Sequence, residues 1–350
     1  ERIGLVEDVR SLQWLSEYQD AGEIKLVCSA TEKNRTLLVD GNRLYCTEQP
    51  ESAIIRQTQI DDDGKDAKLT VRAMLSAARW ADRVVMATEQ VHNAEAGMLS
   101  LTTKHRRGLP GITGAAKGIA VSLDTQITWG SVLDAEITLA TASGLGFREV
   151  FAPDTGTEAF EVYEGVDRTQ GAGYNGYFGD DIDNISSLKI VRGSDGWNYA
   201  IIGGQGEGVN RKIVTASLGA YTGDDLRELW VDAKDIGTTY QIAAPDGSGG
   251  YTYTEATYTE EEYAAVLQAR GLEKLAENLQ TLEIDASIGQ GLMEYGRDYA
   301  LGDIVPLKLT RYGLRLSARI SAVRTIYEST GKKVTAVLSD FNLTKEALSR

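Results

Sequence analysis

The amino-acid sequence predicts an α+β fold that is rich in β-strands. The clearest observation is the alternation of apolar and polar residues in Leu314–Ser321, where a period of two indicates a strand with one buried face. Val334, Ala336 and Leu338 repeat this alternation after a Gly-containing turn, which indicates an antiparallel hairpin. The composition agrees, because the chain has 37 Gly for turns and only 5 Pro.

The first quarter of the chain is predicted to be mostly β. Four segments there have the composition of strands: Glu23–Ser29, Thr36–Val39, Ala53–Ile60 and Leu69–Val71. The turn Asp40-Gly41-Asn42 predicts a hairpin that joins Leu37–Val39 to Leu44–Cys46. Asp61–Gly64 predicts a second turn, and a short helix is expected around Ala73–Arg83.

The segment 91–127 is rich in glycine and weakly patterned, so we expect an extended stretch or loop that becomes ordered against a partner. It contains the basic cluster Lys104–Arg107. A solvated basic loop is the simpler interpretation of this cluster, and docking against an acidic partner is the alternative. Beyond it, apolar residues recur at helical spacing from Trp129, and the helix is expected to end at Gly144.

The rest of the chain is predicted to alternate strands with one long helix. Six strands are expected: Phe147–Phe151, Ala159–Glu164, Ser187–Arg192, Asn198–Ile202, Arg211–Ala216 and Arg227–Asp232. The first two are expected to form a hairpin across Pro153–Gly156. Thr259 and Glu262 have the spacing of a capping box, and the helix that they open is expected to run to about Leu279. A flexible turn is expected at Asp246–Gly250.

Composition limits the classes of function. The chain has 36 Lys and Arg against 51 Asp and Glu, which gives a net charge of −15. This argues against binding to a phosphate backbone as the main function, because such binding depends on clustered cations. At 350 residues, the chain is expected to form more than one domain. No apolar run approaches the roughly 20 residues of a membrane span, and no signal peptide is recognised.

Candidate catalytic residues are sparse. Cys28 and Cys46 are too few for a disulfide scaffold or a four-thiolate metal site, and both lie in strand-like segments where buried thiols are common. Neither His92 nor His105 belongs to a metal-binding motif, and Ser248 lies in a Gly-Ser-Gly turn instead of a nucleophile elbow. We therefore expect no catalytic, cofactor-binding or metal-binding residues and no enzymatic activity.

Two motifs resemble ligand sites but have simpler interpretations. Gly203–Gly208 contains a GxGxxG-like run, yet Val209–Val214 after it is strand-like, whereas a dinucleotide site needs a helix there. A tight connection between strands explains the glycines. Asp61–Asp66 resembles a calcium loop, but Gln59 and Thr70 would then occupy its first and last ligand positions, so a solvated hairpin turn is expected.

Asp167 and Arg168 form an unusual pair. Neighbouring side chains on a strand point to opposite faces, so each of the two needs its own partner. One interpretation is a turn cap followed by an ordinary surface ion pair. The other is a fixed corner that orients two elements at a domain junction.

Five segments occur in a recognisable order along the chain. They are Ser11–Trp14 with Tyr18 and Gly22-Glu23, Tyr163–Thr169, Ile201–Gly208, Arg227–Ala233 and Tyr299–Val305. Together they resemble the siphophage baseplate-hub family, the tail-associated proteins at the tip of long-tailed phages and of related tail-derived particles. The positions that carry the family motifs are Trp14, Tyr163, Asp167, Arg168, Thr169, Gly204, Gly206, Asp232, Leu301, Gly302 and Asp303.

The resemblance implies two β-barrel-like hub domains with intervening α/β domains. The corresponding division is an N-terminal barrel-like hub domain at 1–90, an intermediate α/β domain at 91–216, and a C-terminal barrel-like hub domain at 217–350. The last of these includes a helical insertion at about 259–279. The family carries no catalytic residues to transfer to this chain.

The resemblance also implies a place and partners. Three copies are expected to form a ring at the tail tip of the virion after synthesis in the bacterial cytoplasm. The expected partners are the distal tail protein, the tail tube, the tape measure and the tail-tip or receptor-binding proteins. DNA is expected to pass through the ring without specific binding, and the net charge suggests an acidic lumen.

Two alternatives stay open at this point. One is a tail-associated cell-wall hydrolase or glycan-binding component that uses some of the sixteen Tyr together with Asp residues, although Tyr on strands is more often ordinary sheet packing. The other is the hub of a contractile particle, which shares the fold.

Overall fold

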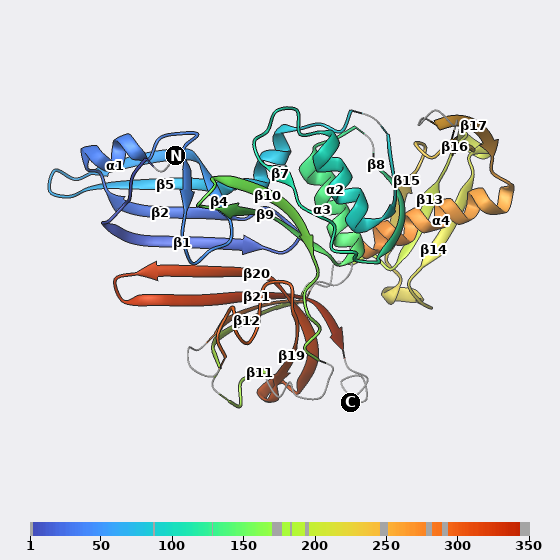
Figure 1. The fold of residues 1–350 in the computed structure, drawn as a ribbon. Helices are drawn as coiled ribbons and strands as arrows, with labels where there is room; N and C mark the ends of the chain where they lie inside the picture. Colours follow the sequence, from blue (N-terminus) through green and yellow to red (C-terminus); the bar gives the residue numbers. More distant parts are fainter. Residues whose placement is uncertain are drawn as a thin grey trace. The chain divides into compact units, whose positions relative to one another are not determined.

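A computed structural model of the chain describes residues 3–86, 88–127, 129–169, 177–182, 184–192, 196–245, 251–277, 282–288 and 293–343. Residue contacts divide the chain into two compact units. Unit 1 comprises Glu1–Ile190 and Glu283–Arg350, and unit 2 comprises Val191–Leu282. Strands outnumber helices in the described residues, which confirms the α+β, β-rich class (Figure 1). The division into hub and α/β domains at 1–90, 91–216 and 217–350 stays a prediction.

Unit 1 is built on a sheet of eleven strands. Nine of them follow in the order β12-β18-β21-β20-β1-β2-β5-β4-β3, and β19 pairs with both β20 and β11. The strands are β1 (Val9–Glu17), β2 (Glu23–Ser29), β3 (Arg43–Tyr45), β4 (Ser52–Asp62), β5 (Ala67–Leu75), β11 (Phe178–Gly179), β12 (Ile185–Arg192), β18 (Leu282–Ile288), β19 (Ile304–Leu309), β20 (Leu314–Glu328) and β21 (Gly331–Leu343). The strands predicted at Glu23–Ser29, Ala53–Ile60, Leu69–Val71 and Ser187–Arg192 are confirmed.

The hairpin β20–β21 connects two parts of this sheet (Figure 1). Residues 322–328 of β20 pair with β1, whereas residues 314–319 pair with β19. β21 pairs with β18 as well as with β20. We call β1–β5 the N-terminal half-sheet, and β11, β12, β18 and β19 the C-terminal half-sheet. Within the described residues neither half closes on itself, so the barrel-like form stays a prediction.

Burial follows the alternation seen in the sequence. On β20, Leu316, Ala318 and Ile320 are at most 2% exposed, which confirms the predicted buried face. The core of the N-terminal half-sheet contains the apolar side chains of alternate strand positions together with one thiol: Trp14, Ile24, Leu26, Cys28, Ile55, Leu69, Val71 and Leu75. Both cysteines are free thiols, and Cys28 is buried as expected.

One hairpin predicted in the N-terminal half-sheet is wrong. Thr36–Val39 is not a strand, because helix α1 spans Glu32–Leu37 and β3 pairs with β4. Thr31 caps α1 by accepting a hydrogen bond from the amide of Asn34 (3.2 Å), and the buried Asn34 side chain donates to Asp8 (2.7 Å). These contacts stabilise the helix, although a turn-forming sequence follows it.

The middle of unit 1 contains helices and short strands: η1 (Ser76–Asp82), β6 (Glu89–Asn93), α2 (Ala94–Lys104), β7 (Ile112–Thr113), β8 (Ser122–Ile127), α3 (Val132–Ser143), β9 (Gly146–Ala152) and β10 (Thr157–Tyr163). Two predictions here are confirmed. The helix α3 ends at Gly144, which adopts the left-handed conformation that glycine favours, and β9 and β10 form a hairpin.

One other prediction for this region is wrong, and one is confirmed only in part. The segment 91–127 is not an extended loop, because it holds α2 and strands. Asn93 caps α2, and the buried carboxylate of Glu95 accepts a hydrogen bond from the amide of Ile119 (2.7 Å), which fixes the glycine-rich stretch. The short helix expected around Ala73–Arg83 is present as the 3-10 helix η1, but it begins only at Ser76, because the strand β5 continues to Leu75.

Unit 2 has a three-stranded sheet in the order β14-β13-β15, a separate hairpin β16–β17 and the helix α4. Its elements are β13 (Tyr199–Gly203), β14 (Ile213–Ser217), β15 (Glu228–Asp232), β16 (Thr239–Pro245), β17 (Tyr251–Thr257) and α4 (Glu260–Glu277). The predicted strands are confirmed, and so is the strand-to-strand role of the GxGxxG-like run. The predicted turn Asp246–Gly250 and the last two residues of the predicted helix, 278–279, lie outside the described residues.

The predicted capping box opens α4. The amide of Thr259 donates to the Glu262 carboxylate (2.8 Å), and the amide of Glu262 donates to the Thr259 hydroxyl (3.2 Å). The helix packs its apolar side on β13 and β14 around buried Ile202 and Leu267. No helix in the described residues has the length and apolar composition needed to cross a membrane.

Candidate functional site

The buried side chain of Tyr18 lies directly after β1 and contacts segments far away in the sequence. Its hydroxyl donates a hydrogen bond to the carbonyl of Gly144 (3.1 Å) and accepts one from the amide of Gly165 (3.0 Å). The ring packs edge-on against Tyr163, with centroids 5.2 Å apart, and the guanidinium of Arg319 lies 5.2 Å from the ring centroid. Burial raises the pKa of Tyr18, so its hydroxyl stays protonated as a donor.

Three glycines allow the backbone to approach this ring. A Cβ atom at Gly146 or Gly302 would lie 2.2 Å from a ring carbon of Tyr18. A Cβ atom at Gly165 would lie 1.9 Å from the carbonyl oxygen of Gly302. Gly302 also has a φ of +92°, which residues with side chains rarely adopt. The close packing therefore requires glycine at all three positions.

Asp303 supplies a buried negative charge next to these glycines. The carboxylate is only 2% exposed and accepts hydrogen bonds from the amides of Val166 (2.9 Å) and Ala300 (2.8 Å). Arg168 forms an ion pair with it from another segment, and the backbones of Arg168 and Ile304 are also hydrogen bonded (2.8 Å). A buried carboxylate is stable only when it is paired in this way. We call Tyr18, Tyr163, Arg168, Asp303 and the three glycines the Tyr18 junction.

The two adjacent charges at 167 and 168 have separate partners, as predicted. Asp167 accepts hydrogen bonds from the amide (2.9 Å) and hydroxyl (2.5 Å) of Thr169, so it caps a turn. Arg168 binds the buried Asp303, which lies 135 residues away along the chain. The pair therefore combines the turn cap of one interpretation with the fixed corner of the other.

A second buried cluster, centred on Arg79, links β9 and β10 to the N-terminal half-sheet. The guanidinium of Arg79 forms ion pairs with Glu149 (2.8 Å) and Glu158 (2.6 Å). The Glu158 carboxylate also accepts hydrogen bonds from the hydroxyls of Ser52 and Ser76, both at 2.6 Å. Burial raises the pKa of Glu149, and the charge of Arg79 opposes that rise. Both carboxylates are thus used in pairing instead of facing a substrate.

The motif positions of unit 2 form a site of their own. Gly204 lies against the helix α4, where a Cβ atom would be 2.7 Å from the hydroxyl of Tyr263. Gly206 has a φ of +100° in the connection between β13 and β14. Asp232 forms an ion pair with Arg211, which also donates to the carbonyl of Gly204 (3.0 Å). These residues hold the end of the small sheet against its connecting loop.

The remaining motif positions and the main residues that the motifs missed lie in unit 1. Trp14 is 1% exposed in the core of the N-terminal half-sheet, and Leu301 is half-buried beside Gly302. The Arg79 cluster was not predicted. One feature of the sequence could have indicated it. Glu149 stands between Phe147 and Phe151 at the spacing of two that marks the buried face of a strand, where an apolar residue is expected.

The basic cluster Lys104–Arg107 is not a free loop. Lys104 forms an ion pair with Glu89 at the end of α2. The guanidinium of Arg106 stacks over Trp80 at 5.1 Å, and Arg107 donates a hydrogen bond to the carbonyl of Val84 (3.0 Å). The charges of this cluster are therefore engaged within unit 1.

These contacts fasten strands and loops to one another. They bring the beginning, the middle and the end of the chain together in unit 1, and most of the polar groups in them are paired with groups of the protein. Among the described residues, no group of three or more His, Cys, Asp or Glu side chains is placed to hold a metal ion. The contacts therefore hold the fold of unit 1 together.

Comparison with known proteins identifies the family of the chain. The family model of the Siphovirus ReqiPepy6 Gp37-like proteins matches residues 1–338. No curated protein sequence matches the chain.

Solved structures of tail proteins share the fold. The tail protein from Neisseria meningitidis MC58 has a TM-score of 0.60 at 15% identity, with 95% of this chain and 92% of that chain covered. The 43 kDa tail protein of prophage MuSo2 from Shewanella oneidensis has a TM-score of 0.60 at 11% identity, with 96% and 95% covered. The prophage tail protein gp18 from Listeria monocytogenes EGD-e has a TM-score of 0.52 at 14% identity, with 99% and 93% covered. The chain therefore belongs to the family of Siphovirus ReqiPepy6 Gp37-like proteins and has the fold of the phage tail proteins that its sequence resembles.

Proposed function

We propose that this protein is the structural hub of a phage tail tip, in which three copies form a ring that connects the tail tube to the tip. The observation that carries the proposal is the hairpin β20–β21, which is shared by two half-sheets in one chain. Each copy then contributes two half-sheets to the ring, and three copies contribute six. A sixfold tail tube can be met by such a ring without a mismatch in symmetry.

The buried contacts support a structural role in the tail. A ring that joins a tube to a tip must keep its two half-sheets in fixed positions while DNA passes. The Tyr18 junction fastens β1 to the segments around Arg168 and Asp303, and the Arg79 cluster fastens the β9–β10 hairpin to the N-terminal half-sheet. The net charge of −15 also suits a channel that should not retain phosphates.

The proposed partners follow from this position. They are two further copies of the chain, the distal tail protein and tube on one side, and the tape measure and tail-tip or receptor-binding proteins on the other. The proposed location is the tail tip of the virion. The barrel-like form of the two hub domains is part of the same proposal.

Two measurements on purified protein test the proposal. Light scattering coupled to size-exclusion chromatography at rising protein concentration is expected to give a mass of three chains, and with the distal tail protein added it is expected to give the mass of three chains plus the bound partner. A stable monomer under both conditions would contradict the ring. Release of soluble fragments from purified peptidoglycan is expected to be absent, and measurable turnover would favour a cell-wall hydrolase instead.

A further inference from the structure

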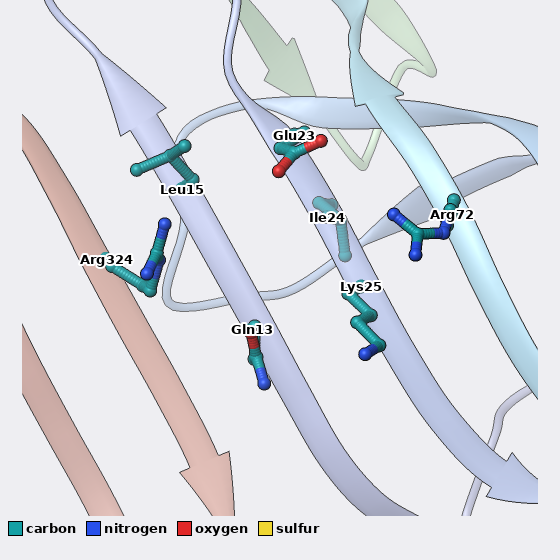
Figure 2. A pocket seen from close by; sticks show the side chains of 7 residues that line it. All are labelled: Gln13, Leu15, Glu23, Ile24, Lys25, Arg72 and Arg324. Atoms are coloured by element: carbon teal, nitrogen blue, oxygen red, sulfur yellow. The ribbon is translucent and has the colours of Figure 1, made fainter.

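A shallow depression of about 60 Å³ lies on the N-terminal half-sheet, on the face opposite the apolar core (Figure 2). It is lined by Gln13, Leu15, Glu23, Ile24, Lys25, Arg72 and Arg324 from β1, β2, β5 and β20. Three of these side chains are cationic and one is anionic, in a chain whose net charge is −15. We call this depression the cationic pocket.

The register of the strands places like charges next to each other in the pocket. Lys25 on β2 is directly opposite Arg72 on β5, an arrangement that destabilises a sheet. On the outer sides of this pair, Lys25 faces Gln13 and Arg72 faces Gln57. The row therefore presents two cations and two amides that can donate hydrogen bonds, and it contains no carboxylate.

The three cations are not paired within the described part of the chain. Lys25, Arg72 and Arg324 have no hydrogen bond or ion pair with another described residue, and Arg324 acts on Glu17 only through space, by opposing the rise in its pKa. An ammonium and a guanidinium beside amide donors is a set of groups that recognises an oxyanion. The volume of the pocket suits a carboxylate.

A complementary feature projects from the same half-sheet. The ends of β4 and β5 form a ribbon on which every residue from Arg56 to Asp66 is exposed, including Ile60 at 52%. Asp61, Asp62 and Asp63 form its tip. Their carboxylates accept hydrogen bonds only from Gln59 and from backbone amides of the turn, and none is in a salt bridge with a described residue. Lys68 is opposite Asp61 in the register, so Asp62 and Asp63 are the most available anions.

The tip cannot reach the pocket of its own chain. Asp62 pairs with Ala67, which is five residues before Arg72 on β5, a distance of about 17 Å along the strand. That separation exceeds the combined length of the two side chains. Contact between tip and pocket therefore requires two molecules, and it joins different surfaces of the two, which is the kind of contact that closes rings.

We propose that the cationic pocket binds the carboxylates of the Asp61–Asp63 tip of a second copy of this chain. The inference rests on the proposed ring and names one of its contacts. Arg72 and Lys25 bind the carboxylates of Asp62 and Asp63, and the exposed Ile60 packs beside Leu15, a half-buried residue that lines the pocket.

Zero-length carbodiimide crosslinking tests the contact directly, because it joins an amine to a carboxylate only when the two touch. Equal amounts of nitrogen-14 and nitrogen-15 protein are mixed, crosslinked and digested. The expected product is a peptide of Lys25 joined to the peptide of Asp61–Asp63, with mixed isotopes that prove an intermolecular bond. An oligomer whose crosslinks never join these two peptides would overturn the inference and leave the ring intact.

Charge reversal gives an independent test of assembly. The pocket variant K25E/R72E and the tip variant D62K/D63K are each expected to raise the dissociation constant of the oligomer about tenfold or more, and the combined variant is expected to restore it to within about threefold. The matched control D154K reverses an exposed charge on the β9–β10 turn and is expected to have no effect. Equal melting temperatures establish that the variants fold.

Further outcomes distinguish failure of the proposed contact from failure of the proposed ring. If neither single variant weakens the oligomer, the inference is wrong although the ring stands. If wild-type protein forms no oligomer alone, with its partners or in the particle, the ring and the inference both fail. If K25E/R72E loses binding to double-stranded DNA in fluorescence anisotropy while assembly is unchanged, the pocket binds phosphate and the inference is overturned.

Discussion

Replacement of Asp303 by Asn tests whether the Tyr18 junction holds unit 1 together. The carboxylate accepts two backbone hydrogen bonds and one from Arg168 while almost fully buried. Hydrogen bonds to charged groups contribute about 1.5–3 kcal/mol each, and breaking one partner from a buried ion pair costs about 3–5 kcal/mol. The Arg168 side chain is 23% exposed, so in the variant water can solvate part of its unpaired charge and reduce the loss of stability. We expect the free energy of unfolding to fall by about 3 kcal/mol.

Urea unfolding followed by tryptophan fluorescence measures this change, with Trp14 and Trp80 as buried reporters in unit 1. The matched control is Asp298→Asn, which removes a carboxylate that pairs with the exposed Arg297 and is expected to change stability by less than about 1 kcal/mol. Equal denaturant slopes in all three proteins are needed for the comparison. A loss of less than about 1 kcal/mol for the Asp303 variant would refute a structural role for the junction.

Three further predictions follow from packing and protonation. Gly302→Ala is expected to lower the free energy of unfolding by about 2 kcal/mol more than Gly296→Ala. Both glycines have positive φ, but only a Cβ atom at Gly302 would meet the buried ring of Tyr18. Equal losses of unfolding free energy for the two variants in urea would contradict this. Burial raises the pKa of Glu51 from 4.5 to about 8, so the folded state keeps a proton that the unfolded chain releases. The contribution of Glu51 to the free energy of unfolding is therefore fully present below about pH 4.5 and is lost as the pH rises to about 8. The loss amounts to up to about 4 kcal/mol, and Glu51→Gln should flatten the curve of unfolding free energy against pH. Burial also raises the pKa of Cys28 to about 11, so a thiol reagent at pH 8 should modify Cys46 first and Cys28 only on unfolding; two fast thiols would count against the fold.

Strands with a clear period of two could be predicted from the sequence. β2 begins and ends where the alternation does, and the capping box at Thr259 and Glu262 gives the start of α4. In these cases the local pattern and the tertiary contacts agree. The fold class followed from such segments.

The failures have a common cause in contacts between distant residues. α1 forms where a hairpin is predicted, because Asn34 binds Asp8 and the carbonyl of Ser29. The segment 91–127 has little periodicity of its own and is ordered by Glu95, which binds amides more than twenty residues away. Local propensity carries no information on these contacts.

The candidate site was visible only in pieces. Tyr163, Arg168 and Asp303 could be singled out from motifs, but their convergence on Tyr18 depends on sequence separations of 135 or more. The cationic pocket was not predicted either, because its residues come from four strands whose register is set by the folded sheet.

The central claim is that three copies, each with two half-sheets joined by one hairpin, form a closed collar at the end of the tail. Electron cryomicroscopy of the tail tip in intact particles tests it most directly. We expect density for three chains around the axis, with the half-sheets alternating in pseudo-sixfold positions next to the last tube ring. Six equivalent chains, a single chain beside the axis, or density for this protein elsewhere in the particle would contradict the claim.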